Sequence, residues 1–185
     1  ISGLIDPVAG AKNSVAEALT NMVWAPLEKD LKSVSLSANW MWPCNNPGED
    51  ARLYEAVEAL SEFAIDLGIN VPTGKDSLSM KQNYKDKSVL SPGPVIVSAA
   101  AHCNAIQQVV EPVLQKNAGS IYYMNMSQDS FKLGGSSFAQ ILNKVGQNAP
   151  SIQDSSQFKS MFNALQDLIK QNLIVAGHDV ASGGL

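Results

Sequence analysis

The sequence predicts a protein of the α/β class in the broad sense, with amphipathic helices and short strands along one chain. The clearest observation is a helix predicted at residues 49–67. Its apolar side chains form one stripe, its acidic side chains lie opposite, and Gly68 ends it. A second helix, at residues 11–24, has the same i, i+3, i+4 spacing of apolar side chains. Alternating polar and apolar side chains at residues 33–42 predict a strand, and the apolar run at 95–101 predicts a buried strand.

Shorter elements complete the predicted order. Along the chain they are a strand at 69–71, a hairpin loop at 83–91, a helix at 105–114, a strand at 121–126, helices at 138–145 and 158–170, and a strand at 173–176. The pattern restarts after residue 117, so we predict two domains, residues 1–117 and 118–185. The chain begins with Ile1 rather than Met and stops directly after a glycine turn, so we expect a piece of a longer protein.

Composition excludes several classes of protein. With 45% hydrophobic and 16% charged residues, the chain resembles an ordinary globular protein. A net charge of −4 and the lack of a Lys/Arg cluster give no reason to expect nucleic acid as a partner. No apolar run approaches the roughly 20 residues of a membrane span, so no membrane is expected and the cytoplasm is the expected compartment. Cys44 and Cys103 fit neither a disulfide framework nor a zinc site, and we expect both to be packing residues.

Glu17 and Asn21 are the first candidate site. They lie one helical turn apart, opposite the apolar stripe of their helix. Carboxylate and amide oxygens are hard ligands that suit Mg²⁺, which completes its shell with water and phosphate. Asp179, beside His178 at the tip of the last predicted strand, is a third oxygen donor if folding brings it there. The alternatives are a solvated helix face for the pair and a hydrogen-bonded strand end for Asp179.

Gly74, Lys75, Asp76 and Ser77 form the second candidate site, directly after a predicted strand. Glycine gives backbone freedom, lysine gives a positive charge for phosphate, and aspartate can serve as a metal ligand or general base. The run is not a Walker loop. Its spacing from Gly68 is one residue too long, and Asp76 replaces the required Ser or Thr. An ordinary turn is the alternative, and the pattern alone does not decide between the two.

Gly134, Gly135 and Ser136 form the third candidate site, just before a predicted helix. Backbone N–H groups at such a position can face an anion, and the serine can cap the helix or bind phosphate. A simple capped helix without a ligand is the alternative.

Five blocks of the sequence, in this order, closely resemble one enzyme family. They are residues 15–21, 36–41, 46–54, 74–81 and 177–185. Together they resemble phosphoribosylformylglycinamidine synthase, also called formylglycinamide ribonucleotide amidotransferase. The resemblance extends over nearly the whole chain, which makes it far more specific than any single motif.

The resemblance implies an ATP-dependent C–N ligase of purine biosynthesis that converts formylglycinamide ribonucleotide to formylglycinamidine ribonucleotide. ATP is expected to activate the formyl amide oxygen as an iminophosphate, which ammonia then displaces. The ammonia is expected to come from glutamine, through a glutaminase domain elsewhere in the parent chain, because no cysteine here resembles its nucleophile. We therefore expect no synthetase activity, and no catalytic residue, in this chain alone.

In the long form of the family the synthetase region is duplicated, and each half resembles aminoimidazole ribonucleotide synthetase. The resemblance implies that residues 1–117 are the N-terminal half-barrel of the second half, an α+β domain. Its antiparallel-rich sheet is expected to be backed by the helices at 11–24 and 50–67. Residues 118–185 are implied to begin the next α/β domain. Self-association through the half-barrel edge is expected, because two half-barrels meet there in this superfamily.

The resemblance also assigns residues. Glu17, Asn21 and Asp179 match magnesium ligands of an auxiliary, structural nucleotide site, with a further ligand expected upstream of Ile1. Ala181 stands where the family often has a serine that touches nucleotide. The residues implied to bind nucleotide or substrate are Lys75, Asp76, Ser77, Gly134, Gly135, Ser136 and Ala181. Two alternatives are a non-catalytic module that binds Mg²⁺ with ATP or ADP to brace its parent, and another ATP-dependent enzyme of the superfamily.

Overall fold

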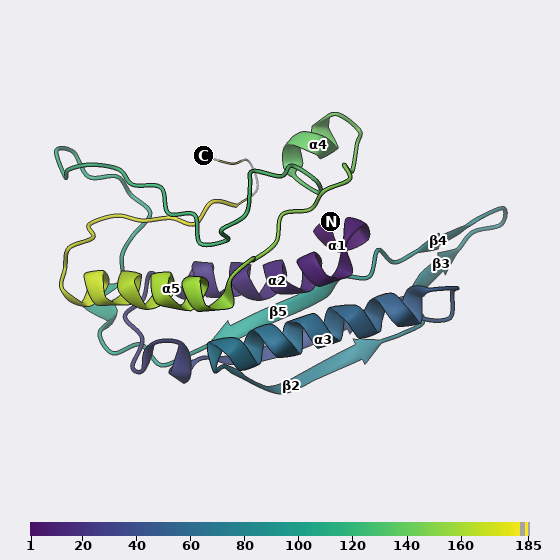
Figure 1. The fold of residues 1–185 in the computed structure, drawn as a ribbon, viewed down its shortest axis with the longest axis horizontal. Helices are drawn as coiled ribbons and strands as arrows, with labels where there is room; N and C mark the ends of the chain where they lie inside the picture. Colours follow the sequence, from purple (N-terminus) through teal and green to yellow (C-terminus); the bar gives the residue numbers. More distant parts are fainter. Residues whose placement is uncertain (182–183, 185) are drawn as a thin grey trace.

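A mixed three-stranded sheet lies at the centre of the fold (Figure 1). The computed structural model describes residues 1–181 and 184. Strand β1 (Ser35–Met41) is the middle strand, parallel to β2 (Asn70–Ser77) and antiparallel to β5 (Val95–Ala100). A separate antiparallel pair, β3 (Lys81–Asn83) and β4 (Ser88–Leu90), extends away from it. The sheet is therefore less antiparallel than expected.

Helices cover one face of this sheet. After the short α1 (Ser2–Ile5), helix α2 (Pro7–Met22) packs against β5, and α3 (Glu49–Leu67) packs against α2 and reaches β2 (Figure 1). Leu36 and Ala38 of β1 are buried beneath the helices, while Ser35 and Ser37 are only partly covered. The two helices expected to back the sheet therefore do so, and the opposite sheet face remains open.

The bounds of α3 agree with the prediction, and Gly68 ends the helix with a φ of 76°. Helix α2 begins earlier than predicted, because Asp6 caps it by accepting a hydrogen bond from the backbone N–H of Ala9. Gly10 lies so close to the preceding helix that a Cβ there would be 2.5 Å from Cα of Gly3. Gly10 therefore allows the two helices to pack closely and does not break α2.

Helix α5 (Ser155–Lys170) joins the same hydrophobic cluster as α2 and α3. Phe158 packs edge-on against Phe63 of α3, with 5.6 Å between ring centroids. Phe162 and Ile169 are also buried in this cluster. The two predicted domains thus share a core here, and the division near residue 117 stays a prediction.

Several predicted elements in the second half are wrong. The helix expected at 105–114 is only a 3₁₀ turn, η2 (Ile106–Gln108), because β-branched Val109 and Val110 and then Pro112 oppose continuation. The segments 121–126 and 173–176 are not strands, since neither has a ladder partner among the described residues. Helix α4 (Ser137–Ile141) is also shorter than predicted.

Three further expectations need correction. The run from Gly74 to Ser77 belongs to strand β2 and is not a turn, because β1 pairs with it along its length. Strand β5 is buried on one side only, with Ile96 52% exposed. Cys44 is partly buried against the core, as expected, but Cys103 is exposed.

In residues 1–181 and 184, no helix is long and apolar enough to cross a membrane.

Candidate functional site

Glu17 and Asn21 lie on the exposed side of α2, as their spacing predicted. The side-chain nitrogen of Asn21 donates a 2.9 Å hydrogen bond to the backbone oxygen of Glu17. This bond fixes the orientation of the amide and leaves Oδ1 of Asn21 as the atom that it can offer to a cation. The pair therefore presents one carboxylate and one amide oxygen along a single stripe of the helix.

Asp179 lies in the segment that follows α5. Gly177 of this segment packs directly on the ring of Trp24, and a Cβ at Gly177 would lie 1.9 Å from Cζ3 of that ring. Trp24 follows the end of α2, so the segment meets the end of the helix that carries Asn21. The side chain of Asp179 is 11% exposed, against 69% for His178, and its Oδ1 lies 3.0 Å from Nδ1 of the histidine. The carboxylate is therefore sheltered.

The glycine pair forms a tight loop before α4. The N–H of Gly134 donates to the backbone oxygen of Asn148, and that of Gly135 donates to Val145. Ser136 caps α4 by accepting a hydrogen bond from the N–H of Ala139. These bonds are those of a capped helix, the alternative considered above, and anion binding at this loop stays a prediction.

A surface pocket of about 320 Å³ lies beside this loop. Its lining includes Gly134, the apolar ring of Phe138, and two lysines, Lys132 and Lys144. Lys132 is paired with Asp129, whereas Lys144 has no ion pair among the described residues, and its positive charge next to an apolar wall suits an anionic ligand with a flat ring system. Lys132 and Lys144 were not among the residues picked out from the sequence, although both stand within ten positions of the glycine pair.

Lys75 and Ser77 lie together on β2, and Nζ of Lys75 donates a 3.2 Å hydrogen bond to Oγ of Ser77. Lys75 is opposite Asn39 of β1, and Asp76 is opposite Trp40. Because side chains alternate along a strand, Lys75 faces the open side of the sheet and Asp76 the side of the helices. Lys75 and Asp76 therefore face opposite sides of the sheet.

Cys44 lies near Asp76 and the start of α3. Partial burial raises the pKa of its thiol, and the carboxylates of Asp50, Glu49 and Asp76 raise it further. A thiol in such surroundings stays protonated at neutral pH and is a poor nucleophile.

The structure does not join all three groups of site residues. Among the described residues, no hydrogen bond or ion pair links Lys75, Asp76 or Ser77 to the others. Residues 1–181 and 184 also contain no cluster of three His, Cys, Asp or Glu side chains placed to hold a metal. A magnesium site at Glu17, Asn21 and Asp179 stays a prediction. Ala181 is exposed, and the next two residues lie outside the described part of the chain.

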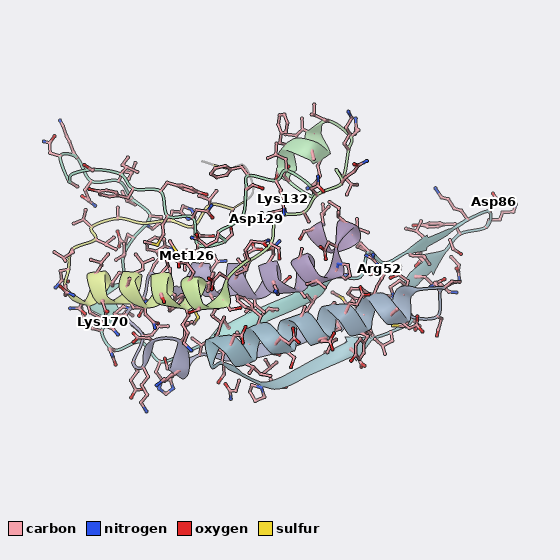
Figure 2. All side chains as sticks on the ribbon, viewed as in Figure 1. Arg52, Asp86, Met126, Asp129, Lys132 and Lys170 are labelled. Atoms are coloured by element: carbon pink, nitrogen blue, oxygen red, sulfur yellow. The ribbon has the colours of Figure 1, made fainter. Side chains whose placement is uncertain are left out.

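Asp129 lies beside Lys132, which lines the pocket (Figure 2). Its Oδ2 accepts hydrogen bonds from Nζ of Lys132 at 2.9 Å and from the backbone N–H of Ser151 at 3.0 Å. Oδ1 accepts from the N–H of Ser130 at 2.8 Å, and the side chain is only 6% exposed. One carboxylate therefore connects two loops that are distant in the sequence.

We expect acid to loosen these two loops before it unfolds the core. The hydrogen bond from Lys132, aided by the N–H groups of Ser151 and Ser130, holds the pKa of Asp129 below its ordinary value. Because the folded pKa is lowered, the stabilisation is present above about pH 4, the unfolded pKa, and is lost as pH falls through the folded pKa. Protection of the Ser151 N–H from hydrogen exchange, relative to the intrinsic rate at the same pH, should therefore fall below about pH 4. The Asp129→Asn variant should show little protection at every pH, and a wild type whose protection does not change with pH would contradict this account.

The fold defines a class of protein: an α+β domain with a helical layer on one face of a mixed sheet. Residues 1–102 match the family described as the FGAR-AT PurM_N-like domain. The chain belongs to this family, that of the phosphoribosylformylglycinamidine synthases.

Curated relatives match the whole chain. A probable phosphoribosylformylglycinamidine synthase of Arabidopsis thaliana, named as chloroplastic/mitochondrial, is 40% identical over 187 residues. The human phosphoribosylformylglycinamidine synthase is 39% identical, and a probable one of Caenorhabditis elegans is 38% identical. Each match covers 100% of this chain but only 13 to 15% of the relative. The chain therefore spans about one seventh of their length.

Solved structures agree on the fold. T. maritima PurL complexed with FGAR has a TM-score of 0.62 at 13% identity, and the match covers 98% of this chain and 27% of that one. T. maritima PurL complexed with ATP has a TM-score of 0.57 at 11% identity, covering 99% and 26%. At these identities the comparison supports the PurM-like α+β fold, which confirms the predicted fold class.

Proposed function

We propose that this chain is part of the second synthetase half of an ATP- and glutamine-dependent ligase, which converts formylglycinamide ribonucleotide to formylglycinamidine ribonucleotide. The observation that carries the proposal is the 38 to 40% identity to three named synthases over the whole chain. The PurL structures complexed with ATP and with FGAR share its fold and agree with these substrates. Glutamine hydrolysis belongs to a glutaminase domain in the remainder of the parent chain.

Glu17, Asn21 and Asp179 are proposed to hold Mg²⁺ with a bound ATP or ADP. All three offer hard oxygen atoms, Asn21 with its amide already oriented, and Asp179 with a sheltered carboxylate. Bound there, the cation would neutralise the phosphate charge of the nucleotide. The contact of Gly177 with Trp24 supports the proposal, because it brings the segment of Asp179 to the end of α2, the helix that carries Glu17 and Asn21.

The phosphate-facing groups are proposed to be Gly134, Gly135 and Ser136, next to the pocket that Lys144 lines. Lys75 and Ser77 on the open sheet face, and Asp76 on the side of the helices, are proposed to meet nucleotide or substrate in the intact enzyme. Ala181 is proposed to lie beside the nucleotide without a hydroxyl donor.

A non-catalytic role for this half is the second proposal, and the methyl side chain of Ala181 favours it. A nucleotide held without turnover would brace the parent enzyme, since any ligand that binds only the folded state stabilises it. Both versions of the proposal place a nucleotide at the same residues.

We expect ADP to bind the chain only when Mg²⁺ is present. Glu17→Ala and Asp179→Ala should each weaken binding by about 1 to 3 kcal/mol, or roughly 5- to 150-fold, because each removes a charged oxygen donor. Isothermal titration calorimetry measures this directly, without any need for turnover.

Glu28→Ala is the matched control, because Glu28 is an exposed carboxylate beyond the end of α2. It should leave the affinity unchanged. Equal binding by wild type, Glu17→Ala and Asp179→Ala would remove the metal assignment while leaving the family assignment intact.

A further inference from the structure

The β3–β4 hairpin projects from the body as an arm, here residues 80–90. Every residue of this arm is exposed. It is joined to the body at its base, where the N–H of Met80 donates to the backbone oxygen of Trp42 and Ser91 donates to Met80. Figure 1 shows the arm extending beyond the N-terminal end of α3, and Figure 2 places Asp86 at its tip. An isolated two-stranded hairpin is only marginally stable in water, so a partner surface would stabilise it.

The arm combines positive charge with apolar surface. Lys81, Lys85 and Lys87 oppose the single carboxylate of Asp86, in a chain whose net charge is −4. Tyr84 is 57% exposed and Val89 50% exposed. None of the ion pairs among the described residues involves a lysine of the arm. The arm thus offers cations and apolar side chains to another surface.

Helix α3 carries the complementary surface, which we call the acidic face. Glu55, Glu58 and Glu62 are exposed at i, i+3 and i+7, and no ion pair in the described part of the chain neutralises them. Like charges at this spacing repel one another, so an added cation is favourable. Tyr54 and Ile65, 66% and 72% exposed, place apolar surface on the same outer helix.

We propose that the arm of one copy docks on the acidic face of a second copy, and the reverse, in a two-fold dimer. The arm continues the direction of α3 beyond its N-terminal end (Figure 1). A two-fold rotation therefore lays each arm alongside the N-terminal part of the other copy's α3. Strand rise gives the arm a reach of roughly 20 Å, and α3 is about 28 Å long. The contact is self-complementary, as a two-fold interface requires.

This interface differs from the half-barrel edge at which self-association was predicted from the resemblance. The edge strands of the three-stranded sheet are β2 and β5, whereas the arm and the acidic face lie outside that sheet. A dimer through the arm should also respond to salt, because exposed charges are screened within about 8 to 10 Å at 0.1 to 0.15 M ionic strength. Charge and salt dependence therefore separate the two interfaces.

The test is analytical ultracentrifugation of the 185-residue chain at low and high salt. Lys85→Glu with Lys87→Glu should weaken the dimer at least about ten-fold at low salt, and Glu55→Lys with Glu62→Lys should do the same. Mixing the two reversed proteins should restore a dimer as a heterodimer, because the negative arm of one then meets the positive face of the other, and the positive arm meets the negative face. Combining all four substitutions in one chain restores complementarity and should restore the dimer.

Lys29→Glu with Lys32→Glu is the matched control, because both lysines are exposed and far from the arm in sequence. It should leave association unchanged. A monomer at high concentration and low salt would overturn the proposal. So would a dimer that ignores both charge reversals but is lost on Ile96→Asp, since that result places the interface on the open sheet face.

Discussion

Replacing Gln166 with leucine is expected to lower the free energy of unfolding by about 3 to 5 kcal/mol. Gln166 is a polar side chain with 0% exposure, in the middle of the shared core. Its Oε1 accepts a hydrogen bond from the N–H of Leu27 at 2.8 Å, and its Nε2 donates to the backbone oxygens of Val23 and Ala25. Leucine fills the space but leaves these backbone groups buried without partners, and each such loss costs about 1 to 3 kcal/mol.

Urea denaturation followed by tryptophan fluorescence measures the change, and hydrogen exchange at Leu27 reports the broken bond. Gln157→Leu is the matched control, since Gln157 lies on the same helix but is exposed. It should change stability by less than about 0.5 kcal/mol. A loss below about 1 kcal/mol in Gln166→Leu would show that water replaces the amide at little cost.

The buried hydrogen bonds of Gln166 are a feature of α5 that was not predicted from the sequence. The helix was predicted from its apolar side chains, and its N-terminus differs only because Asp154 caps it. Gln166 falls among the buried positions Phe162, Leu165 and Ile169, so a polar residue within the apolar stripe was the available signal. Its partners lie about 140 positions away and cannot be inferred from spacing.

Local patterns predicted the long helices α2, α3 and α5 well, because a helix satisfies its own backbone. Strands need partners, and this explains the errors at residues 121–126 and 173–176. Both segments have strand-forming side chains, yet Ile121 is 80% exposed, with no ladder in the described residues. The opposite error occurred at Lys75 and Asp76, where glycine and proline suggested a turn and pairing with β1 imposed a strand.

The candidate metal site likewise combines two residues that a local pattern predicted with one that depends on a long-range contact. The period of one helix predicted that Glu17 and Asn21 share a stripe. The hydrogen bond between them confirms this. The placement of Asp179 depends on Gly177 packing against Trp24, a contact between the two ends of the chain. No spacing rule predicts such a contact.

Gly74→Ala is expected to destabilise the sheet by about 1 to 3 kcal/mol and to displace Lys75 and Ser77. A Cβ at Gly74 would lie 2.2 Å from the backbone oxygen of Ala38, its register partner on β1. The obstructing atom belongs to the backbone of a central strand, so no side chain can rotate away to make room. Relief requires β2 to move outward, and β2 is an edge strand that can do so.

Urea denaturation gives the loss of stability, with Thr73→Ala as the control, because Thr73 is the exposed neighbour on the same strand. If Lys75 and Ser77 meet substrate in the parent enzyme, Gly74→Ala should weaken substrate binding there while the helical layer and ADP binding at Glu17 persist. Unchanged stability would mean that β1 and β2 are less closely paired than the register implies. Loss of both ligand sites together would mean instead that the sheet and the helical layer unfold as one unit.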